Sequence, residues 1–315
     1  MRVAYVLPSL QQPSGWRRHS TALLREISDY VEFVVFASRS DYHEAKSLYP
    51  DRHVFRLPVT QSSSLGSPRG IFKLAACYWN IKWGRFPKVD LVHSLEAYPC
   101  GLVGSWLAKK LNCPHVITTH GTYGVIWYDH PLDCKVYKRV LKRTSRVCPV
   151  SFETARQMQN YFGDALTHTS VHPILNGNDF YKFVSRDEAF ERKNPSQPTL
   201  LTVGDVKPRK GQHLSIQAFA QVKQNLPKAR YFIVGEYRQN DYFRELKQII
   251  DKQNIQDVYF LGVISDEELR NYYQQASLFV LTPQVGQGSE RFHFEGFGLV
   301  YLEAGAYGLP VVATR

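Results

Sequence analysis

The sequence predicts an α/β protein made of two Rossmann-like domains, each with a parallel sheet and helices on both faces. Three observations predict this fold class. Short β-rich runs alternate with helical patterns along the whole chain, as in doubly wound sheets. The length of 315 residues is too great for one typical domain and suits two. A polar stretch near the middle separates two halves that repeat the same alternation.

Seven predicted strands and five predicted helices make up the first half. The strand candidates are short runs rich in β-branched and aromatic residues, namely Val3–Leu7, Val31–Ala37, His53–Leu57, Leu91–Ser94, His115–Thr119, Arg146–Ser151 and Thr169–Leu175. Apolar residues recur at helical spacing between them, in the segments 18–29, 70–84, 98–111, 132–143 and 152–162.

The second half repeats the scheme with five strands and four helices. The strand candidates are Leu200–Gly204, Tyr231–Gly235, Val258–Leu261, Leu278–Leu281 and Val311–Ala313. Helices are expected near 210–224, 240–253, 266–275 and 299–307. Ser265 and Glu268 form a capping box at the start of the third helix, and Gly308 and Pro310 end the fourth.

The boundary between the halves is marked by turn-forming residues. Asn176–Asp179 is a turn signal, and the polar stretch that follows ends with Pro195 and Pro198. We expect an N-terminal domain over 1–180, a linker over 181–196 and a C-terminal domain over 197–315. Two such domains facing each other form a central cleft at the carboxyl ends of their strands, where ligands bind in open α/β sheets.

The composition indicates a reduced, cytoplasmic globular protein. Hydrophobic residues make up 43% and charged residues 21%, which is ordinary for globular domains. The longest uncharged apolar run, Ala97–Ala108, is shorter than the roughly 20 residues that a transmembrane helix needs. Met1–Leu7 leads directly into Pro8 and lacks the apolar stretch of a signal peptide. The five cysteines are an odd number without a Cys-x-x-Cys pair, which disfavours a disulfide framework and a zinc ribbon.

The net charge of +11 lies almost wholly in the first half. Residues 1–185 hold 23 Lys and Arg against 13 Asp and Glu, whereas residues 186–315 hold 16 against 15. The densest basic cluster has helical spacing and comprises Lys135, Lys138, Arg139, Lys142, Arg143 and Arg146. It is either a solvated helix face or a docking site for anionic lipid headgroups, which would place the protein peripherally on the inner face of the membrane. No nucleic-acid motif is present and no aromatic residues are interleaved, so we expect no nucleic-acid partner.

A cluster of three cations follows the first strand of the second half. Lys207, Arg209 and Lys210 stand where the next helix begins, and a helix N-terminus attracts anions through its free amides and dipole. Cations are unfavourable at that end unless an anionic ligand is present, although a solvated basic loop is the alternative. The chain has no Gly-x-Gly-x-x-Gly after a strand and no P-loop. It also has no His-Glu-x-x-His cluster, so we expect no metal site.

Two carboxylates stand eight positions apart near the end of the chain. Glu295 precedes Gly296 and Gly298, which let the backbone approach a ligand closely. Glu303 lies one turn after Leu299, beside an apolar stripe. A carboxylate in that position needs a hydrogen-bond donor, because burying it without one is costly. Ribose or sugar hydroxyls could supply the donor, and a capped surface helix is the alternative.

These stretches resemble a known family. FEGFGLVYLEAGAYGLPVVAT, which holds Glu295 and Glu303, resembles the Glu-x7-Glu signature of retaining glycosyltransferases of family 4, which have the GT-B fold. Shorter stretches resemble other motifs of that family, namely HGT, PVSFETARQM, ILNGND and FLGVISDEELRNYYQQASLFVLTP. The likeness is nearly continuous in the second half and patchy in the first. It implies a nucleotide-diphosphate sugar as the donor and a second domain that binds it.

The resemblance also implies roles for individual residues. Lys210 matches the lysine on the donor diphosphate, Glu295 the glutamate near the donor sugar hydroxyls, and Glu303 the glutamate that binds the ribose. His120 matches the first-domain histidine that faces the reaction centre. The remaining matches are backbone positions: Gly15 in the first glycine loop, Val263 and Ile264 at the nucleobase, and Phe297, Gly298, Leu299 and Val300 at the sugar and diphosphate.

Three positions depart from the family pattern. The first loop has Ser14 before Gly15, where two glycines are common. Asp205 stands where the family usually has an arginine, and Arg209 is the substitute we expect for the second cation. The sequence stops just after Val311–Ala313, whereas the family continues through another strand and further helices, so we expect a fragment or a truncated product with an incomplete second domain.

The sequence thus predicts a retaining, metal-independent hexosyltransferase that needs no cofactor. The hexose would pass from a nucleotide-diphosphate sugar to a hydroxyl of a glycolipid, a polysaccharide or another glycoconjugate. Lys210, Arg209 and the amides at 298–300 would stabilise the departing diphosphate, while Glu295 would orient the sugar. Two alternatives are a sugar-nucleotide epimerase of the same fold, and a non-catalytic remnant that binds donor or membrane.

Overall fold

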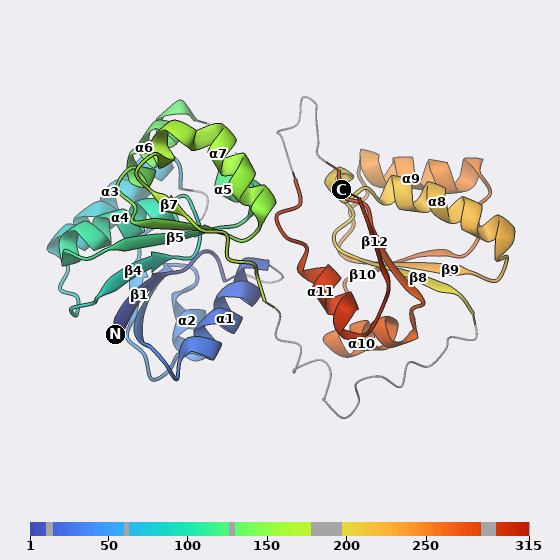
Figure 1. Cartoon of the computed structure of the whole chain (residues 1–315), viewed down its shortest axis with the longest axis horizontal. Helices are drawn as coiled ribbons and strands as arrows, with labels where there is room; N and C mark the ends of the chain where they lie inside the picture. Colours follow the sequence, from blue (N-terminus) through green and yellow to red (C-terminus); the bar gives the residue numbers. More distant parts are fainter. Residues whose placement is uncertain (11–14, 60–62, 126–129, 178–196, 285–293, 315) are drawn as a thin grey trace. The chain divides into compact units, whose positions relative to one another are not determined.

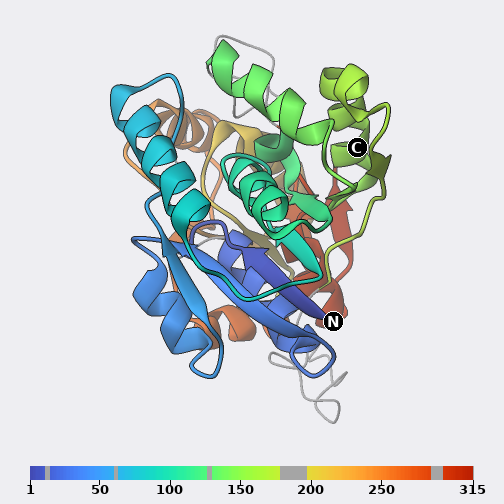
Figure 2. The same ribbon diagram turned by 90° about the vertical axis from the view of Figure 1, so that its left-hand side faces the viewer.

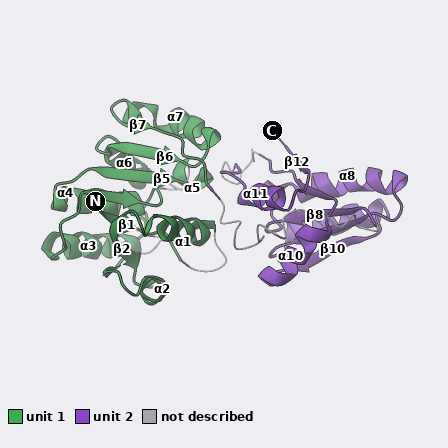
Figure 3. Ribbon diagram, turned by 60° about the horizontal axis from the view of Figure 1, so that its bottom comes forward, with its two compact units in different colours: residues 1–176 green, residues 177–315 purple. Residues whose placement is uncertain are grey.

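The computed structural model describes residues 1–10, 15–59, 63–125, 130–177, 197–284 and 294–314. The chain divides into two compact units, residues 1–176 and 177–315 (Figure 3). The predicted linker over 181–196 lies outside the described residues. Each unit is an α/β structure on its own sheet (Figure 1).

Unit 1 is built on a seven-stranded parallel sheet in the order β3-β2-β1-β4-β5-β6-β7. Its strands are β1 (Arg2–Val6), β2 (Glu32–Ser38), β3 (Val54–Leu57), β4 (Leu91–Ser94), β5 (His115–Thr119), β6 (Arg146–Pro149) and β7 (Ser170–Val171). All seven predicted strands are present. The last is shorter than predicted, because Pro173 has no amide for the ladder, although His172 and Ile174 still donate to carbonyls of β6.

Helices cover both faces of the unit 1 sheet. Figures 1 and 2 show α3 (Pro68–Trp83), α4 (Cys100–Leu111) and α6 (Pro131–Leu141) side by side on one face. The other face carries α1 (Gly15–Ile27) and α2 (Tyr42–Leu48), and α7 (Phe152–Leu166) leads from β6 to β7. The sequence analysis missed α2, which buries only Ala45, and α5 (Gly121–Val125). Two of the five residues of α5 are glycine, which disfavours a helix.

Unit 2 is built on a five-stranded parallel sheet in the order β10-β9-β8-β11-β12. Its strands are β8 (Thr199–Val203), β9 (Arg230–Val234), β10 (Val258–Gly262), β11 (Leu278–Leu281) and β12 (Val311–Ala313). Its α-helices are α8 (Gln212–Asn225), α9 (Asp241–Lys252), α10 (Asp266–Gln275) and α11 (Leu299–Ala306). The predicted capping box of Ser265 and Glu268 is confirmed. The helix predicted at 210 begins at Gln212, because Pro208–Lys210 form a 3-10 turn that Gly211 ends with a φ of 67°.

Both sheets have the strand order that leaves a topological switch point. In unit 1 the order reverses between β1 and β4, and in unit 2 between β8 and β11. Ligands of open α/β sheets bind outside the carboxyl ends of the strands at such points. The predicted fold class, two Rossmann-like units with parallel sheets, is confirmed. Within the described residues, no helix has the length and apolar character needed to cross a membrane.

Candidate functional site

The carboxyl edge of the unit 2 sheet holds the predicted cation cluster. The 3-10 turn Pro208–Lys210 follows β8 and is fixed against the end of β11, where Thr282 Oγ1 donates to the Gly211 carbonyl at 2.8 Å. Only glycine fits at position 211, because a Cβ would lie 1.8 Å from the Thr282 carbonyl oxygen. The turn therefore holds Arg209 and Lys210 at a fixed place beside the strand end.

Lys210 and Arg209 share one carboxylate. Lys210 Nζ lies 2.6 Å from Glu295 Oε2, and Arg209 Nη1 lies 3.2 Å from the same oxygen. The Lys210 side chain is only 10% exposed. Burial lowers the pKa of Lys210, and the charge of Glu295 opposes that shift. A buried ammonium keeps its charge only with an anion beside it, so an incoming phosphate could take the place that Glu295 holds.

Asp205 turns to a different partner. Its Oδ2 lies 2.6 Å from Lys207 Nζ, and both side chains are exposed. The second cation beside Lys210 is Arg209, the residue that the sequence analysis named as a substitute for the missing arginine. Lys207, the third member of the predicted cluster, thus pairs with Asp205, whereas Arg209 and Lys210 pair with Glu295.

Glu303 is buried on the second turn of α11. Glu303 is 6% exposed, and its Oε2 accepts a hydrogen bond from the Tyr273 hydroxyl at 2.9 Å. The hydrogen-bond donor that this buried carboxylate needs is thus Tyr273 of α10, which the sequence did not indicate. The helix that carries Glu303 starts after Gly298, whose φ is 78°, and has no side-chain cap. The first amides of α11, at Leu299 and Val300, consequently have no intrahelical partner.

The other residues predicted to bind the nucleotide-sugar donor lie in loops of unit 2 and at the start of α11. Val263 and Ile264 follow β10 directly, and Val263 is 68% exposed while Ile264 packs against the core. Phe297 is half-buried before α11, and Val300 packs on the same core cluster as Ile264. The described contacts join Arg209, Lys210 and Glu295 directly. Glu303 has a separate partner, and Val263 stands apart at the end of β10.

The carboxyl edge of the unit 1 sheet holds a different cluster. His120 follows β5, and its ring lies 4.6 Å from the ring of His19, centroid to centroid. Glu96, which is fully buried, follows β4. Its Oε1 accepts from the amides of Ala97 at 2.7 Å and His120 at 3.5 Å, and it also takes a side-chain hydrogen bond from Trp16. Four residues from three connections therefore meet at the switch point of the sheet.

Burial keeps this cluster neutral. It raises the pKa of Glu96 to about 8, because three hydrogen bonds to the carboxyl only partly offset the loss of water. It lowers the pKa of His19 to about 4 and that of His120 well below its usual range. The His120 ring donates to the Leu95 carbonyl. Among the described residues Nε2 has no partner, so a ring with its proton on Nδ1 would present Nε2 as an acceptor.

Three buried polar atoms of the cluster have no hydrogen-bond partner among the described residues. They are His120 Nε2, His19 Nε2 and Glu96 Oε2. Unpaired buried polar atoms are uncommon and indicate a ligand or an ordered water. Of this cluster, only His120 is indicated by a motif in the sequence. Glu96 could have been noticed as an acidic residue directly after a strand, but only the strand order shows that His19 and Trp16 lie next to it.

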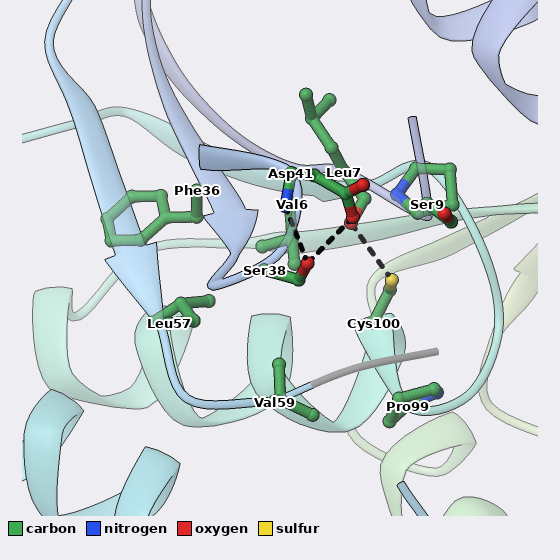
Figure 4. A pocket seen from close by; sticks show the side chains of 11 residues that line it. Val6, Leu7, Ser9, Phe36, Ser38, Asp41, Leu57, Val59, Pro99 and Cys100 are labelled. Carbon is green, nitrogen blue, oxygen red and sulfur yellow. Dashed lines mark hydrogen bonds between the residues drawn. The ribbon is translucent and has the colours of Figure 1, made fainter. Parts of the chain in front are cut away.

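Two further features of unit 1 bear on the site. Gly15 opens α1 and is exposed, with open space around its Cα, while Ser14 lies outside the described residues. A hollow lies at the ends of β1, β2 and β3, where Asp41 accepts from Ser38 Oγ (Figure 4). Its volume of about 10 Å³ holds roughly one water molecule, too little for a sugar.

No group of three or more His, Cys, Asp or Glu side chains that could hold a metal ion occurs among the described residues. The basic cluster on and after α6 is mostly exposed: Lys135, Arg139, Lys142, Arg143 and Arg146 face solvent, and Lys138 is half-buried. The helix itself ends at Leu141, so the last three cations lie beyond it.

Comparison with known proteins matches both units to one enzyme family. The family model "Glycosyltransferase Family 4" matches residues 13–180, more than half of the chain. The model "Glycosyl transferases group 1" matches residues 184–315. These matches cover both candidate clusters.

Two relatives and one solved structure illustrate the likeness. An uncharacterized glycosyltransferase of Methanocaldococcus jannaschii is 26% identical over 98% of this chain and 78% of its own. The GDP-mannose-dependent monoacylated alpha-(1-6)-phosphatidylinositol monomannoside mannosyltransferase of Corynebacterium glutamicum is 29% identical over 90% of this chain and 72% of its own. The structure of Anabaena HepE with UDP-glucose superposes with a TM-score of 0.65 at 21% identity, covering 99% of this chain and 80% of that one.

Proposed function

Because the chain belongs to glycosyltransferase family 4, we propose that it transfers a hexose, with retention of configuration, from a nucleotide-diphosphate sugar to a hydroxyl of a lipid-linked acceptor. The observation that carries the proposal is the shared carboxylate of Lys210 and Arg209 at the carboxyl edge of the unit 2 sheet. Two cations held there by a fixed turn suit a diphosphate, which gains negative charge as the sugar departs.

The donor is bound by exchange of partners at Glu295. Without ligand, Glu295 pairs with both Lys210 and Arg209 and offsets one of their two charges. When the diphosphate arrives, its oxygens take both cations and the free amides of Leu299 and Val300. Glu295 is then released to accept hydrogen bonds from hydroxyls of the transferred sugar. The cations thus stabilise the leaving group, and Glu295 orients the hexose without attacking it.

The nucleoside occupies the neighbouring loops of unit 2. The buried Glu303 accepts from the ribose hydroxyls, and the backbone at Val263 and Ile264 holds the base. The exposed Val263 side chain covers the base from one side. These contacts fix the donor without metal, since the cations and the helix amides supply the positive charge.

His120 acts on hydroxyls through its neutral ring. Its Nε2 is an unprotonated acceptor held in place by the bond from Nδ1 to the Leu95 carbonyl. A hydroxyl of the hexose or of the acceptor donates to Nε2. Glu96 fixes the His120 backbone by accepting a hydrogen bond from its amide. No side chain in the described ranges is assigned as the base for the acceptor, so the departing phosphate takes the acceptor proton on the same face.

A lipid-linked acceptor is favoured by the curated relatives. The Corynebacterium glutamicum enzyme is a mannosyltransferase whose acceptor is a phosphatidylinositol mannoside. The donor base and hexose stay open between a GDP-mannose of that kind and the UDP-glucose of the HepE structure. A sugar-nucleotide epimerase would use the same donor residues without an acceptor.

The test is acceptor-dependent release of nucleoside diphosphate. The chain is incubated with GDP-mannose or UDP-glucose, with and without glycolipid acceptors extracted from membranes, and in EDTA. We expect release only with acceptor, an α-anomeric product by NMR and no loss in EDTA. Conversion of the donor to a free epimer or sugar without acceptor would establish the epimerase instead, and no turnover with any donor that binds would refute the proposal.

A further inference from the structure

The outer face of α3 exposes aromatic side chains. The helix buries Gly70, Leu74, Cys77 and Ile81 on its inner side. On the opposite side the exposed fractions are 75% for Phe72, 50% for Trp79 and 73% for Trp83. At 100° per residue these three fall within one narrow strip, and Ile71 and Tyr78, which are also exposed, both lie to one side of it. A helix on a solvated surface would carry polar residues there.

Cations accompany these rings and acids do not. Residues 52–89 contain seven Lys and Arg and no Asp or Glu. Lys82 Nζ lies over the ring of Trp79 at 4.7 Å and over that of Trp83 at 5.3 Å, and the two rings are parallel. Lys110, at the end of α4, donates to the Lys82 carbonyl at 2.9 Å. The face is therefore both apolar and positively charged.

The face is held rigid by buried contacts. Asp133 of α6 is 2% exposed and accepts from the Leu65 amide at 2.8 Å, from Ser64 Oγ and from the Tyr98 hydroxyl. These bonds tie the start of α3 and the start of α4 to α6. Tyr78 of α3 also meets Trp106 of α4, with ring centroids 5.4 Å apart. Figure 2 shows the three helices side by side, so the exposed cations of α6 lie on the same side of the sheet.

We propose that this aromatic–basic face, defined by Ile71, Phe72, Tyr78, Trp79 and Trp83 with Arg69, Lys73 and Lys82, docks on the surface of an anionic bilayer. Indole and phenyl rings enter the interface between headgroups and acyl chains, where Trp and Tyr are most stable. The cations meet lipid phosphates. The cations on α6 add long-range attraction to the anionic bilayer, while the aromatic rings of α3 insert into it.

Charge argues against the other partners. A second copy of the chain would set Arg69, Lys73 and Lys82 of this face against the same three cations. For nucleic acid, bases would need open ring faces, but one face of Trp79 and one of Trp83 are already covered by Lys82. The inference does not depend on the proposed transfer reaction.

The test is sedimentation with vesicles of phosphatidylcholine, with and without phosphatidylglycerol. The test variant carries Phe72→Gln, Trp79→Gln and Trp83→Gln, and the control carries Tyr30→Gln, Leu48→Gln and Leu226→Gln, which are exposed residues elsewhere. We expect the wild type and the control to bind the anionic vesicles with a blue shift of tryptophan emission. The test variant should lose about a hundredfold in partitioning, and Lys73→Gln with Lys82→Gln roughly thirtyfold at low salt.

Controls separate docking from folding and from the reaction. Thermal melting should be unchanged in all variants, because every substituted ring is exposed, and nucleoside diphosphate affinity in solution should also be unchanged. Equal vesicle binding by test variant and control would overturn the proposal. So would a wild-type dimer that the test variant converts to a monomer, or binding to a single-stranded oligonucleotide that outcompetes the vesicles.

Discussion

The carboxyl edges of the two sheets differ in the charge of the side chains that they hold. At the edge of unit 2, Lys210 and Arg209 keep full charges by sharing Glu295. At the edge of unit 1, burial leaves Glu96 and His120 neutral, with unpaired atoms. Both edges lie at the switch point of a parallel sheet. The same architecture thus offers paired charges in one unit and unpaired neutral acceptors in the other.

That difference matches the two kinds of ligand that the proposed reaction needs. A diphosphate carries negative charge and binds to cations, which a carboxylate occupies until the diphosphate displaces it. A hydroxyl carries none and is best met by a neutral acceptor such as an imidazole Nε2. We therefore expect changes in unit 2 to act on the nucleotide, and changes in unit 1 to act on transfer or on stability.

The largest effect is expected for Lys210→Ala. Removing one group that stabilises charge in a transition state lowers kcat by roughly a hundredfold to a thousandfold. Lys207→Ala is the matched control, because Lys207 is exposed and pairs with Asp205 instead of Glu295. Steady-state release of nucleoside diphosphate measures both. Equal losses in the two variants would mean that the charge of the segment matters and the position of Lys210 does not.

A large effect on stability is expected from the pKa of Glu96. Its folded pKa of about 8 exceeds that of an unfolded glutamate, so the folded state binds the extra proton and stability falls as pH rises from about 4.5 to about 8. Burial lowers the pKa of His19, and that of His93 in β4, to about 4, and both shifts act oppositely below about pH 6.5. The free energy of unfolding should peak near pH 6.5 and fall by about 2 kcal/mol by pH 8.

Glu96→Gln isolates that effect. The amide keeps an acceptor for the Ala97 and His120 amides but cannot ionise. Urea unfolding at pH 6.5 and pH 8 should therefore show no decline for the variant. A decline as steep as in the wild type would show that another group causes it.

A smaller effect is expected for His120→Ala. Losing one hydrogen bond to a sugar or acceptor hydroxyl should lower the transfer rate by about tenfold. The affinity for free nucleoside diphosphate should stay the same, because Nε2 belongs to the unit 1 cluster. Transfer assays and calorimetry on one preparation give both numbers, and weaker nucleotide binding would contradict the assignment.

The smallest effect is expected for Glu303→Gln. The amide oxygen still accepts from Tyr273, so the fold is kept and only the charge on the proposed ribose contact is lost. Affinity for a nucleoside diphosphate should fall by about threefold to tenfold. The matching 2′,3′-dideoxy nucleotide should bind wild type and variant alike. A difference with the dideoxy ligand would place Glu303 away from the ribose.

Much of the fold could be predicted, because the pattern of each element is local. The strands Leu91–Ser94 and Leu278–Leu281 and the helix over 266–275 have the predicted bounds. The cations of unit 2 could be named because a strand, a turn and a helix start are adjacent in sequence. The contact between Tyr273 and Glu303 spans 30 positions, and nothing local indicates it.

Two groups were missed because they need three dimensions. The cluster of His19, Glu96 and His120 forms only once β1, β4 and β5 are known to be neighbours. The rings of α3 have the composition of a core helix, and only burial shows that Trp79 and Trp83 face outward. The sequence analysis therefore sought membrane contact in charge alone, at 135–146, and overlooked the aromatic surface on the same side of the sheet.

The most direct test of the central claim is calorimetric titration of UDP and GDP into the wild type, Lys210→Ala and Glu295→Gln. If Glu295 competes with the diphosphate for the two cations, the two variants change the affinity for nucleoside diphosphate in opposite directions. Lys210→Ala should bind about tenfold to a hundredfold more weakly, while Glu295→Gln should bind about threefold to tenfold more tightly, since a competing anion is gone. Weaker binding by both variants, or unchanged binding by Lys210→Ala, would contradict it.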